Sequence, residues 1–110
     1  MITHIAPTAN VSSYVQVSGC AFVYGNAMVY DNALVSIYAQ VYDSAKVSGN
    51  ARVSGAAWVY DAARVFGAAI VSGNAQVYGR ADVSGNAILE GDVTISRGWI
   101  KDVHWWREIL

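Results

Sequence analysis

The sequence predicts an all-β protein of one architecture, a single-stranded triangular parallel β-helix (β-solenoid) of about five 18-residue coils. The first observation is an aliphatic residue at every sixth position, without a break, from Ile5 to Ile95. The second is a small apolar residue four positions after each aliphatic residue from Ile5 to Leu89, which gives a series from Ala9 to Val93. A fixed short period indicates stacked structural repeats, and six residues fit one short strand and one turn. Three such units make one coil of a triangle.

Each hexad divides into inward, outward and corner positions. In the hexad from Val47 to Arg52, the valine and the alanine point inward while Ser48 and Arg52 point outward. Its Gly-Asn pair falls at the corner, where residues that tolerate a positive φ are needed. Fifteen hexads of this kind run from Ile5 to Thr94. The repeats therefore account for most of the chain.

The outward residues give an independent test of the stacking. If coils lie over one another, outward residues should repeat every 18 positions, and two columns do so. One column is Tyr24, Tyr42, Tyr60 and Tyr78, and the other is Ser18, Ser36, Ser54 and Ser72. Parallel strands stacked about 4.8 Å apart would place each column along one outer face.

The repeats define three segments: an N-terminal edge at 1–4, the β-helix at 5–95, and an aromatic C-terminal tail or cap at 96–110. In the tail the hexad pattern decays, and Asp102 is placed to cap a short helix. The open strand edges of a solenoid invite further pairing unless they are covered. We therefore expect the tail tryptophans to cover the last coil or to contact a neighbouring subunit.

Composition and charge exclude several classes of protein. Seven basic and eight acidic residues give a net charge of −1, which provides no basic stripe for nucleic acid. No apolar run approaches the ~20 residues of a membrane span, and the N-terminus does not resemble a signal peptide. Cys20 is the single cysteine, which fits a reducing cytoplasm. We expect no cofactor and no metal site, since the stacked Asp43 and Asp61 alone offer too few oxygen ligands.

The hexad from Val71 to Gln76 has the spacing aliphatic-x-x-x-small-x and resembles the hexapeptide repeat of left-handed parallel β-helices. Units such as Val-Ser-Gly-Asn-Ala are more specifically similar to short bacterial and prophage-encoded hexapeptide-repeat proteins. This resemblance implies a left-handed coil and a bacterial or phage origin, with a host protein as a possible partner. The glycine two positions after the valine is also similar to bactofilins, which implies a right-handed coil as the second choice.

The same resemblance raises the possibility of an enzyme, because hexapeptide acyltransferases share this fold. Their general base is a histidine on or beside the coils. The two histidines of this chain, His4 and His104, lie outside the repeats, and no loop is inserted to build a cofactor site. We therefore expect no catalytic residues and no enzymatic activity.

Aromatic residues are the candidate interface. Tyrosine and tryptophan combine a large apolar body with a polar group, which suits them to protein interfaces. The alternative is a ladder that only packs along one solenoid face. The predicted interface or partner-binding residues are Phe22, Tyr24, Tyr42, Trp58, Tyr60, Tyr78, Trp99, Trp105 and Trp106.

The sequence therefore favours a non-enzymatic structural or interaction protein, a rigid β-helix that displays an aromatic face. We expect it to associate with itself as a dimer or trimer, or to bind a protein partner. The first alternative is a module that binds a small ligand or carbohydrate on the aromatic face. The second is an acyltransferase-like hexapeptide enzyme.

Overall fold

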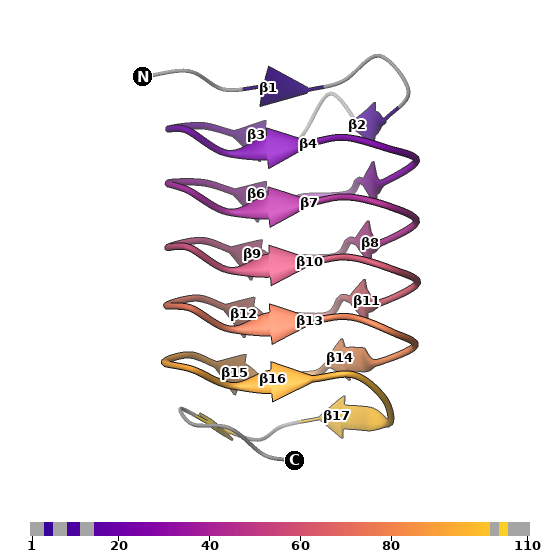
Figure 1. Cartoon of the computed structure of the whole chain (residues 1–110), viewed down its shortest axis with the longest axis vertical. Coiled ribbons are helices and arrows are strands. Elements are labelled where there is room, and N and C mark those ends of the chain that lie inside the picture. Colours follow the sequence, from indigo (N-terminus) through magenta and orange to yellow (C-terminus); the bar gives the residue numbers. More distant parts are fainter. Residues whose placement is uncertain (1–3, 6–8, 12–14, 102–103, 106–110) are drawn as a thin grey trace.

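Eighteen short strands form three parallel sheets in the computed structural model, which describes residues 4–5, 9–11, 15–101 and 104–105 (Figure 1). Sheet A contains β1 (His4–Ile5), β4 (Phe22–Val23), β7 (Gln40–Val41), β10 (Trp58–Val59), β13 (Gln76–Val77) and β16 (Thr94–Ile95). Sheet B contains β2 (Asn10–Val11), β5 (Met28–Val29), β8 (Lys46–Val47), β11 (Arg64–Val65), β14 (Asp82–Ser84) and β17 (Trp99–Lys101). Sheet C contains β3 (Gln16–Val17), β6 (Leu34–Val35), β9 (Arg52–Val53), β12 (Ile70–Val71), β15 (Ile88–Leu89) and β18 (His104–Trp105).

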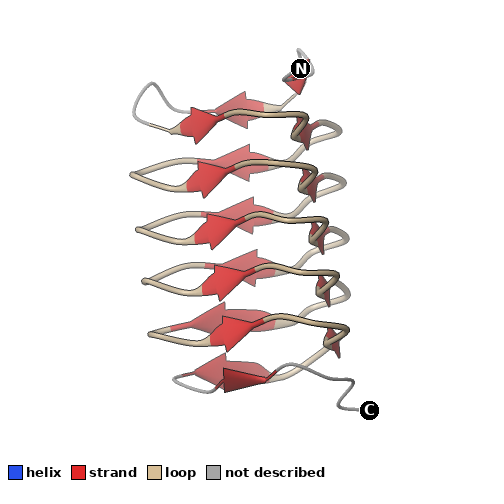
Figure 2. Cartoon of the chain, turned by 90° about the vertical axis from the view of Figure 1, so that its left-hand side faces the viewer, coloured by secondary structure: helices blue, strands red, loops and turns tan. Residues whose placement is uncertain are grey.

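The strands stack in the 18-residue register that the sequence predicts. Val23 pairs with Val41, and Val41 pairs with Val59. Successive hexads enter sheets A, B and C in turn, so three hexads complete one triangular rung of the solenoid (Figure 2). The predicted all-β parallel β-solenoid is therefore confirmed. The left-handed winding remains a prediction.

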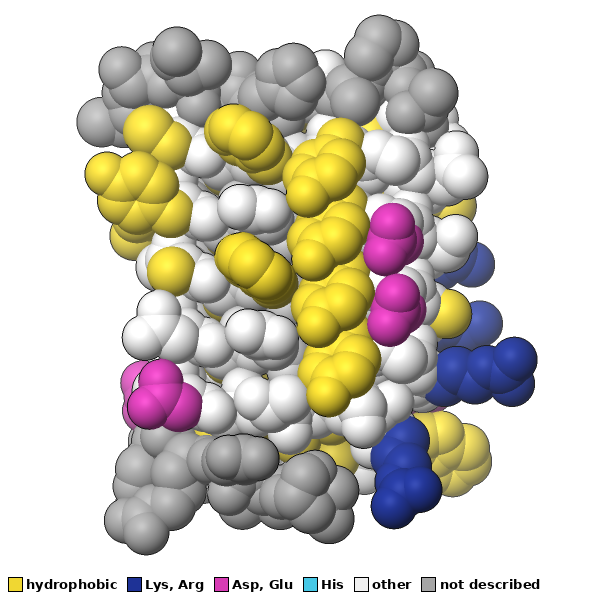
Figure 3. Space-filling model, viewed as in Figure 1, with side chains coloured by type: hydrophobic (Ala, Val, Ile, Leu, Met, Phe, Trp, Pro, Cys, Tyr) yellow, Lys and Arg dark blue, Asp and Glu magenta, His cyan; other side chains and the backbone are white. Residues whose placement is uncertain are grey.

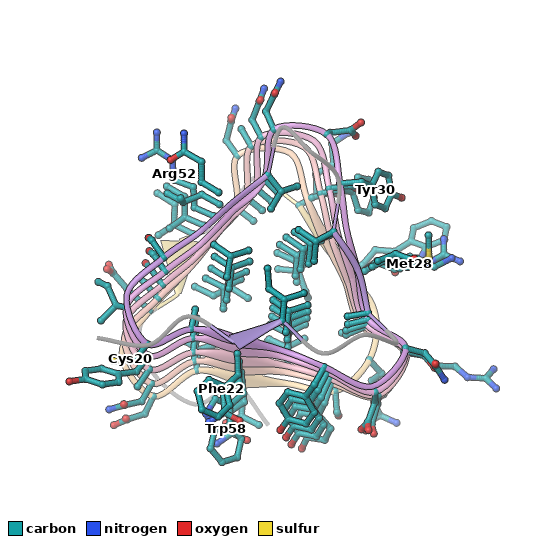
Figure 4. The ribbon with its side chains drawn as sticks, turned by 90° about the horizontal axis from the view of Figure 1, so that it is seen from above. Cys20, Phe22, Met28, Tyr30, Arg52 and Trp58 are labelled. Carbon is teal, nitrogen blue, oxygen red and sulfur yellow. The ribbon has the colours of Figure 1, made fainter. Side chains whose placement is uncertain are left out.

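The interior is filled by the two inward positions of every hexad. Alanine and valine side chains from Ala21 to Val83 alternate there, and nearly all of them are completely buried. Viewed along the axis, they project into the triangle from all three sides (Figure 4). No polar or charged residue is buried in the described part of the chain. Because each rung repeats the shape of the one before, the apolar side chains stack in columns that fill the interior of the solenoid.

The corners require a left-handed backbone conformation. Gly73 has φ of 64°, and a Cβ added to it would lie 2.6 Å from the backbone nitrogen of Gly91 in the next rung. Three aspartates replace glycine at equivalent corners, and two of them accept a hydrogen bond from the rung below. Asp31 Oδ2 accepts from the Gly49 N–H at 3.1 Å, and Asp61 Oδ2 accepts from Gly79 in the same way.

The C-terminal tail continues the solenoid, which corrects the expected short helix. Trp99 pairs with Asp82 and His104 pairs with Ile88, so β17 and β18 extend sheets B and C. The separation between paired residues falls from 18 to 17 and then to 16, because each of the last two turns is one residue shorter. This shortening removes the hexad periodicity from the sequence while the strands continue. Residues 102–103 and 106–110 lie outside the described part of the chain.

Ile37 provides a test of the corner constraint. It is the one β-branched residue among the described non-glycine positive-φ positions, at φ 62°. This conformation costs an ordinary L-residue about 1–2 kcal/mol. We expect Ile37→Asp to raise the free energy of unfolding by about 1 kcal/mol, because aspartate tolerates this region and can accept the Gly55 N–H. Urea unfolding followed by circular dichroism measures the change.

The matched control is Tyr38→Asp, which adds the same charge one residue later without relieving the corner. We expect it to leave the free energy of unfolding within about 0.5 kcal/mol of the parent. Equal shifts in the two variants would contradict the corner explanation.

Candidate interaction surface

The outer face of sheet A carries the largest group of aromatic side chains. We call it the aromatic surface and define it by six residues from four successive rungs. Figure 3 shows hydrophobic side chains in a continuous strip along this face, with further hydrophobic side chains beside the strip. The six residues are Phe22, Tyr24, Tyr42, Trp58, Tyr60 and Tyr78.

Four of these residues form a stacked tyrosine ladder. The ring centroids of Tyr24 and Tyr42 are 4.8 Å apart, and those of Tyr42 and Tyr60 are 5.0 Å apart, with interplanar angles of 2°. Tyr60 and Tyr78 continue the ladder at 5.1 Å and 6°. These spacings match the distance between parallel strands. The ladder therefore follows directly from identical residues in an 18-residue register.

A second row of side chains runs beside the ladder, one on each rung. Strand pairing aligns Phe22 with Gln40, Gln40 with Trp58, and Trp58 with Gln76. The two aromatic residues of this row make edge-to-face contacts with the ladder. Trp58 lies 6.4 Å from the ring centroids of both Tyr42 and Tyr60, at 72°. Such contacts favour one fixed orientation of the ring.

The glutamines of the second row hold the tyrosine hydroxyls. The Tyr24 hydroxyl donates to Gln40 Oε1 at 3.2 Å, and the Tyr60 hydroxyl donates to Gln76 Oε1 at 3.3 Å. Each bond joins one rung to the next. The polar ends of these rings are therefore tied to the solenoid, and the aromatic surface is ordered by stacking and hydrogen bonding together.

The aromatic surface is nevertheless open to solvent. Phe22 is 41% exposed and Trp58 is 37% exposed, whereas the ladder tyrosines are half-buried. The two apolar rings of the second row therefore stand out above the ladder. Aromatic rings that are both fixed and exposed can bury apolar area on binding without much loss of side-chain freedom.

Acidic side chains border the ladder and affect its ionisation (Figure 3). Burial raises the pKa of Tyr42 to about 12, and negative charge on Tyr24, Tyr60, Asp43 and Asp61 adds to this increase. Burial is also the main cause of the raised pKa of Tyr24 and of Tyr60, with aspartate charge contributing to both. Tyr24, Tyr42 and Tyr60 therefore stay neutral to a higher pH than an ordinary tyrosine.

Two of the tail tryptophans, Trp99 and Trp105, lie in sheets B and C and not in sheet A, which carries the aromatic surface. Trp99 lies at an outward position of sheet B and is 87% exposed, so it does not cover the end of the core. Trp105 aligns with Leu89 in sheet C, and Trp106 lies outside the described residues. The interface role predicted for these three tryptophans remains untested.

Sequence reasoning missed an exposed apolar corner between sheets C and A. Ile37 is 51% exposed and Tyr38 is 64% exposed, and they line a shallow pocket together with Ser18, Cys20 and Ser36. The sequence does contain an indication of this corner, because Ile37 occupies a corner position where the other hexads usually have glycine or aspartate. Cys20 is a free thiol at this corner.

The two histidines are not brought together. His4 lies in β1 of sheet A in the first rung, and His104 lies in β18 of sheet C in the last rung. Among the described residues, no three histidine, cysteine or acidic side chains cluster as metal ligands. Within the same residues, no helix has the length and hydrophobicity needed to cross a membrane.

The fold and its repeats define the class of this protein, a repeat β-solenoid with an 18-residue coil. The family model of the YdcK beta solenoid repeat matches three segments, residues 21–37, 45–61 and 75–91. Successive segments begin 24 and 30 residues apart, which are multiples of six and not of eighteen, so the hexad is the unit that the match follows. The comparisons with curated proteins and with solved structures give no match.

Ionisation of the ladder predicts a loss of stability at high pH. Tyrosines of the unfolded chain ionise near pH 10, whereas Tyr42 keeps its proton in the fold until about pH 12. Between these values the folded state binds more protons than the unfolded state, so the free energy of unfolding falls as the pH rises. Urea unfolding at a series of pH values measures this slope.

We expect Tyr42→Phe to make the fall in the free energy of unfolding between pH 10 and 12 shallower, because the residue with the raised pKa is absent. Tyr38→Phe is the control, since it removes a phenol that lies outside the ladder. If the parent and the Tyr42→Phe variant lose stability equally over this range, the ladder is not the cause.

Proposed function

We propose that this chain is a non-enzymatic interaction protein whose β-solenoid holds the aromatic surface in place for association with a protein. The partner we favour is a second copy of the chain in a dimer or trimer, and the second candidate is another protein, such as a host factor if the chain is phage-encoded. The observation that carries the proposal is the combination of fixed geometry and exposure in the Phe22 and Trp58 rings.

Ordered aromatic side chains lower the entropic cost of association. Binding usually costs about 0.5–1.5 kcal/mol for each flexible side chain that becomes immobile at an interface. Stacking and hydrogen bonds to glutamine order the ladder tyrosines, and edge-to-face contacts with the ladder order the Phe22 and Trp58 rings, before any partner arrives. Most of the free energy gained from burying them is then available for association.

A sugar- or nucleotide-binding module is less well supported by the same geometry. Stacking of a planar ligand or a sugar needs a free ring face. In the ladder, the faces of Tyr42 and Tyr60 are covered by the neighbouring tyrosines at about 5 Å. The surface offers ring edges and hydroxyl groups instead, which suit a broad protein contact.

The sharpest test replaces the two exposed rings by the residue that the fold already uses in the same row. The Phe22→Gln, Trp58→Gln double variant makes the second row uniform, because Gln40 and Gln76 already occupy equivalent positions. We expect it to fold normally and to associate at least tenfold more weakly, since two exposed aromatic contacts are lost. Sedimentation equilibrium over a range of concentrations measures the association.

The matched control is Ile70→Gln, Ile88→Gln, which removes two partly buried apolar side chains from the outer face of sheet C. We expect its association to equal that of the parent. A parent that stays monomeric and captures no protein partner would overturn the proposal. So would an aromatic-surface variant that associates as strongly as the control.

A further inference from the structure

The second row of the aromatic surface alternates in size from rung to rung. Phe22 and Trp58 are exposed rings on alternate rungs, and Gln40 and Gln76 occupy the rungs after them. The rings therefore recur about every 10 Å along the axis, since each rung adds about 4.8 Å. The amides between them are engaged with the tyrosine hydroxyls of the ladder. Over these four rungs, exposed rings and smaller glutamine side chains therefore alternate.

Two symmetric arrangements bring two such faces together with their solenoid axes parallel or antiparallel. A two-fold axis parallel to the solenoid axis places equal rungs opposite each other, so Phe22 meets Phe22 and Trp58 meets Trp58. A two-fold axis parallel to the strands reverses the order of the rungs. Centred on the tyrosine ladder, this second axis places Phe22 opposite Gln76 and Trp58 opposite Gln40.

We propose that the aromatic surface binds a second copy of this chain in the second of these arrangements. We call it the antiparallel arrangement, because the order of the rungs is reversed in the second copy. This inference rests on the proposed function and specifies its partner and geometry. Each exposed ring of the row then faces a glutamine of the other copy, which leaves room for the ring, as close packing requires. The contact is isologous, because the same residues serve on both sides, and it closes as a dimer.

The antiparallel arrangement also places ladder against ladder. Tyr24 lies opposite Tyr78 of the second copy, and Tyr42 lies opposite Tyr60. Because the ladder tyrosines are half-buried rings that each carry a hydroxyl, the centre of the contact combines apolar rings with hydroxyl groups. This composition is typical of interface centres.

Charge at the edge of the contact gives the dimer a distinctive salt dependence. Asp43 and Asp61 border the ladder, and the reversed order of the rungs places Asp43 of one copy near Asp61 of the other. We expect the dissociation constant to fall when the ionic strength rises from 0.01 to 0.1 M, as the Debye length shortens from about 30 to about 10 Å. The Asp43→Asn, Asp61→Asn variant should lose this dependence.

The size of the face sets the strength that we expect. The aromatic surface covers four rungs, about 19 Å of a molecule that measures 34 × 22 × 20 Å, so each copy contributes less than the ~800 Å² that one partner gives to a standard interface. The dimer should therefore be weak and concentration-dependent. This makes covalent trapping a better readout than chromatography.

The experiment uses two single-cysteine chains in a Cys20→Ser background. Serine suits this site because Ser44 occupies the same position of its hexad. One chain carries Phe22→Cys and the other carries Gln76→Cys, and Trp58 is retained in both. Under mild oxidation, the antiparallel dimer cross-links the mixture but neither chain alone. Mass spectrometry of the cross-linked peptide identifies the pair, and circular dichroism confirms that both chains fold.

Each other result would overturn the antiparallel dimer. Cross-linking of the Gln76→Cys chain alone indicates equal rungs in contact, and it refutes the geometry while leaving the proposed self-association intact. If both cysteine chains still dimerise and the mixture gives no cross-link, the antiparallel pairing of this face is refuted. A parent that is monomeric at every concentration refutes both this inference and the proposed self-association. Dissociation of the dimer by added salt would also contradict the arrangement.

Discussion

The in-register stacking of parallel rungs is the constraint on which the rest of this structure depends. Each rung is bonded to the next by backbone hydrogen bonds at every second residue, as in the bonds from Phe22 to Ala39 and from Tyr24 to Val41. An 18-residue register then places valine on valine and alanine on alanine through the core. A slip of one residue would turn the inward positions outward. The apolar core and the register therefore maintain each other.

The aromatic surface is a direct consequence of this register and needs no special backbone feature. Identical residues at 18-residue intervals are brought to the strand spacing, so tyrosines stack at about 5 Å whether or not a partner is present. The ladder alone is therefore explained by solenoid packing. What packing does not explain is the exposure of Phe22 and Trp58, because glutamine fills the same row elsewhere.

The sequence predicted the core, the three sheets and the tyrosine ladder, because all of them follow from an unbroken period of six. It failed at the tail, where the loss of one residue in each of two turns hides strands that still pair at Trp99 and His104. It also missed the exposed corner at Ile37 and Tyr38, because a period identifies a corner position but not a residue that is unfavourable there. Backbone strain and side-chain exposure follow from the three-dimensional structure, whereas the 18-residue register follows directly from the spacing of residues in the sequence.

In a solenoid of this kind, the residues that determine the fold point inward, and the residues that differ from one rung to the next point outward. The inward positions are nearly invariant from rung to rung, so they carry little information beyond the fold itself. The outward columns are free to differ between rungs, because each outward side chain contacts mainly its neighbours above and below. The alternation of Phe22, Gln40, Trp58 and Gln76 is therefore a property that folding does not impose. Any account of what the molecule recognises has to explain that alternation.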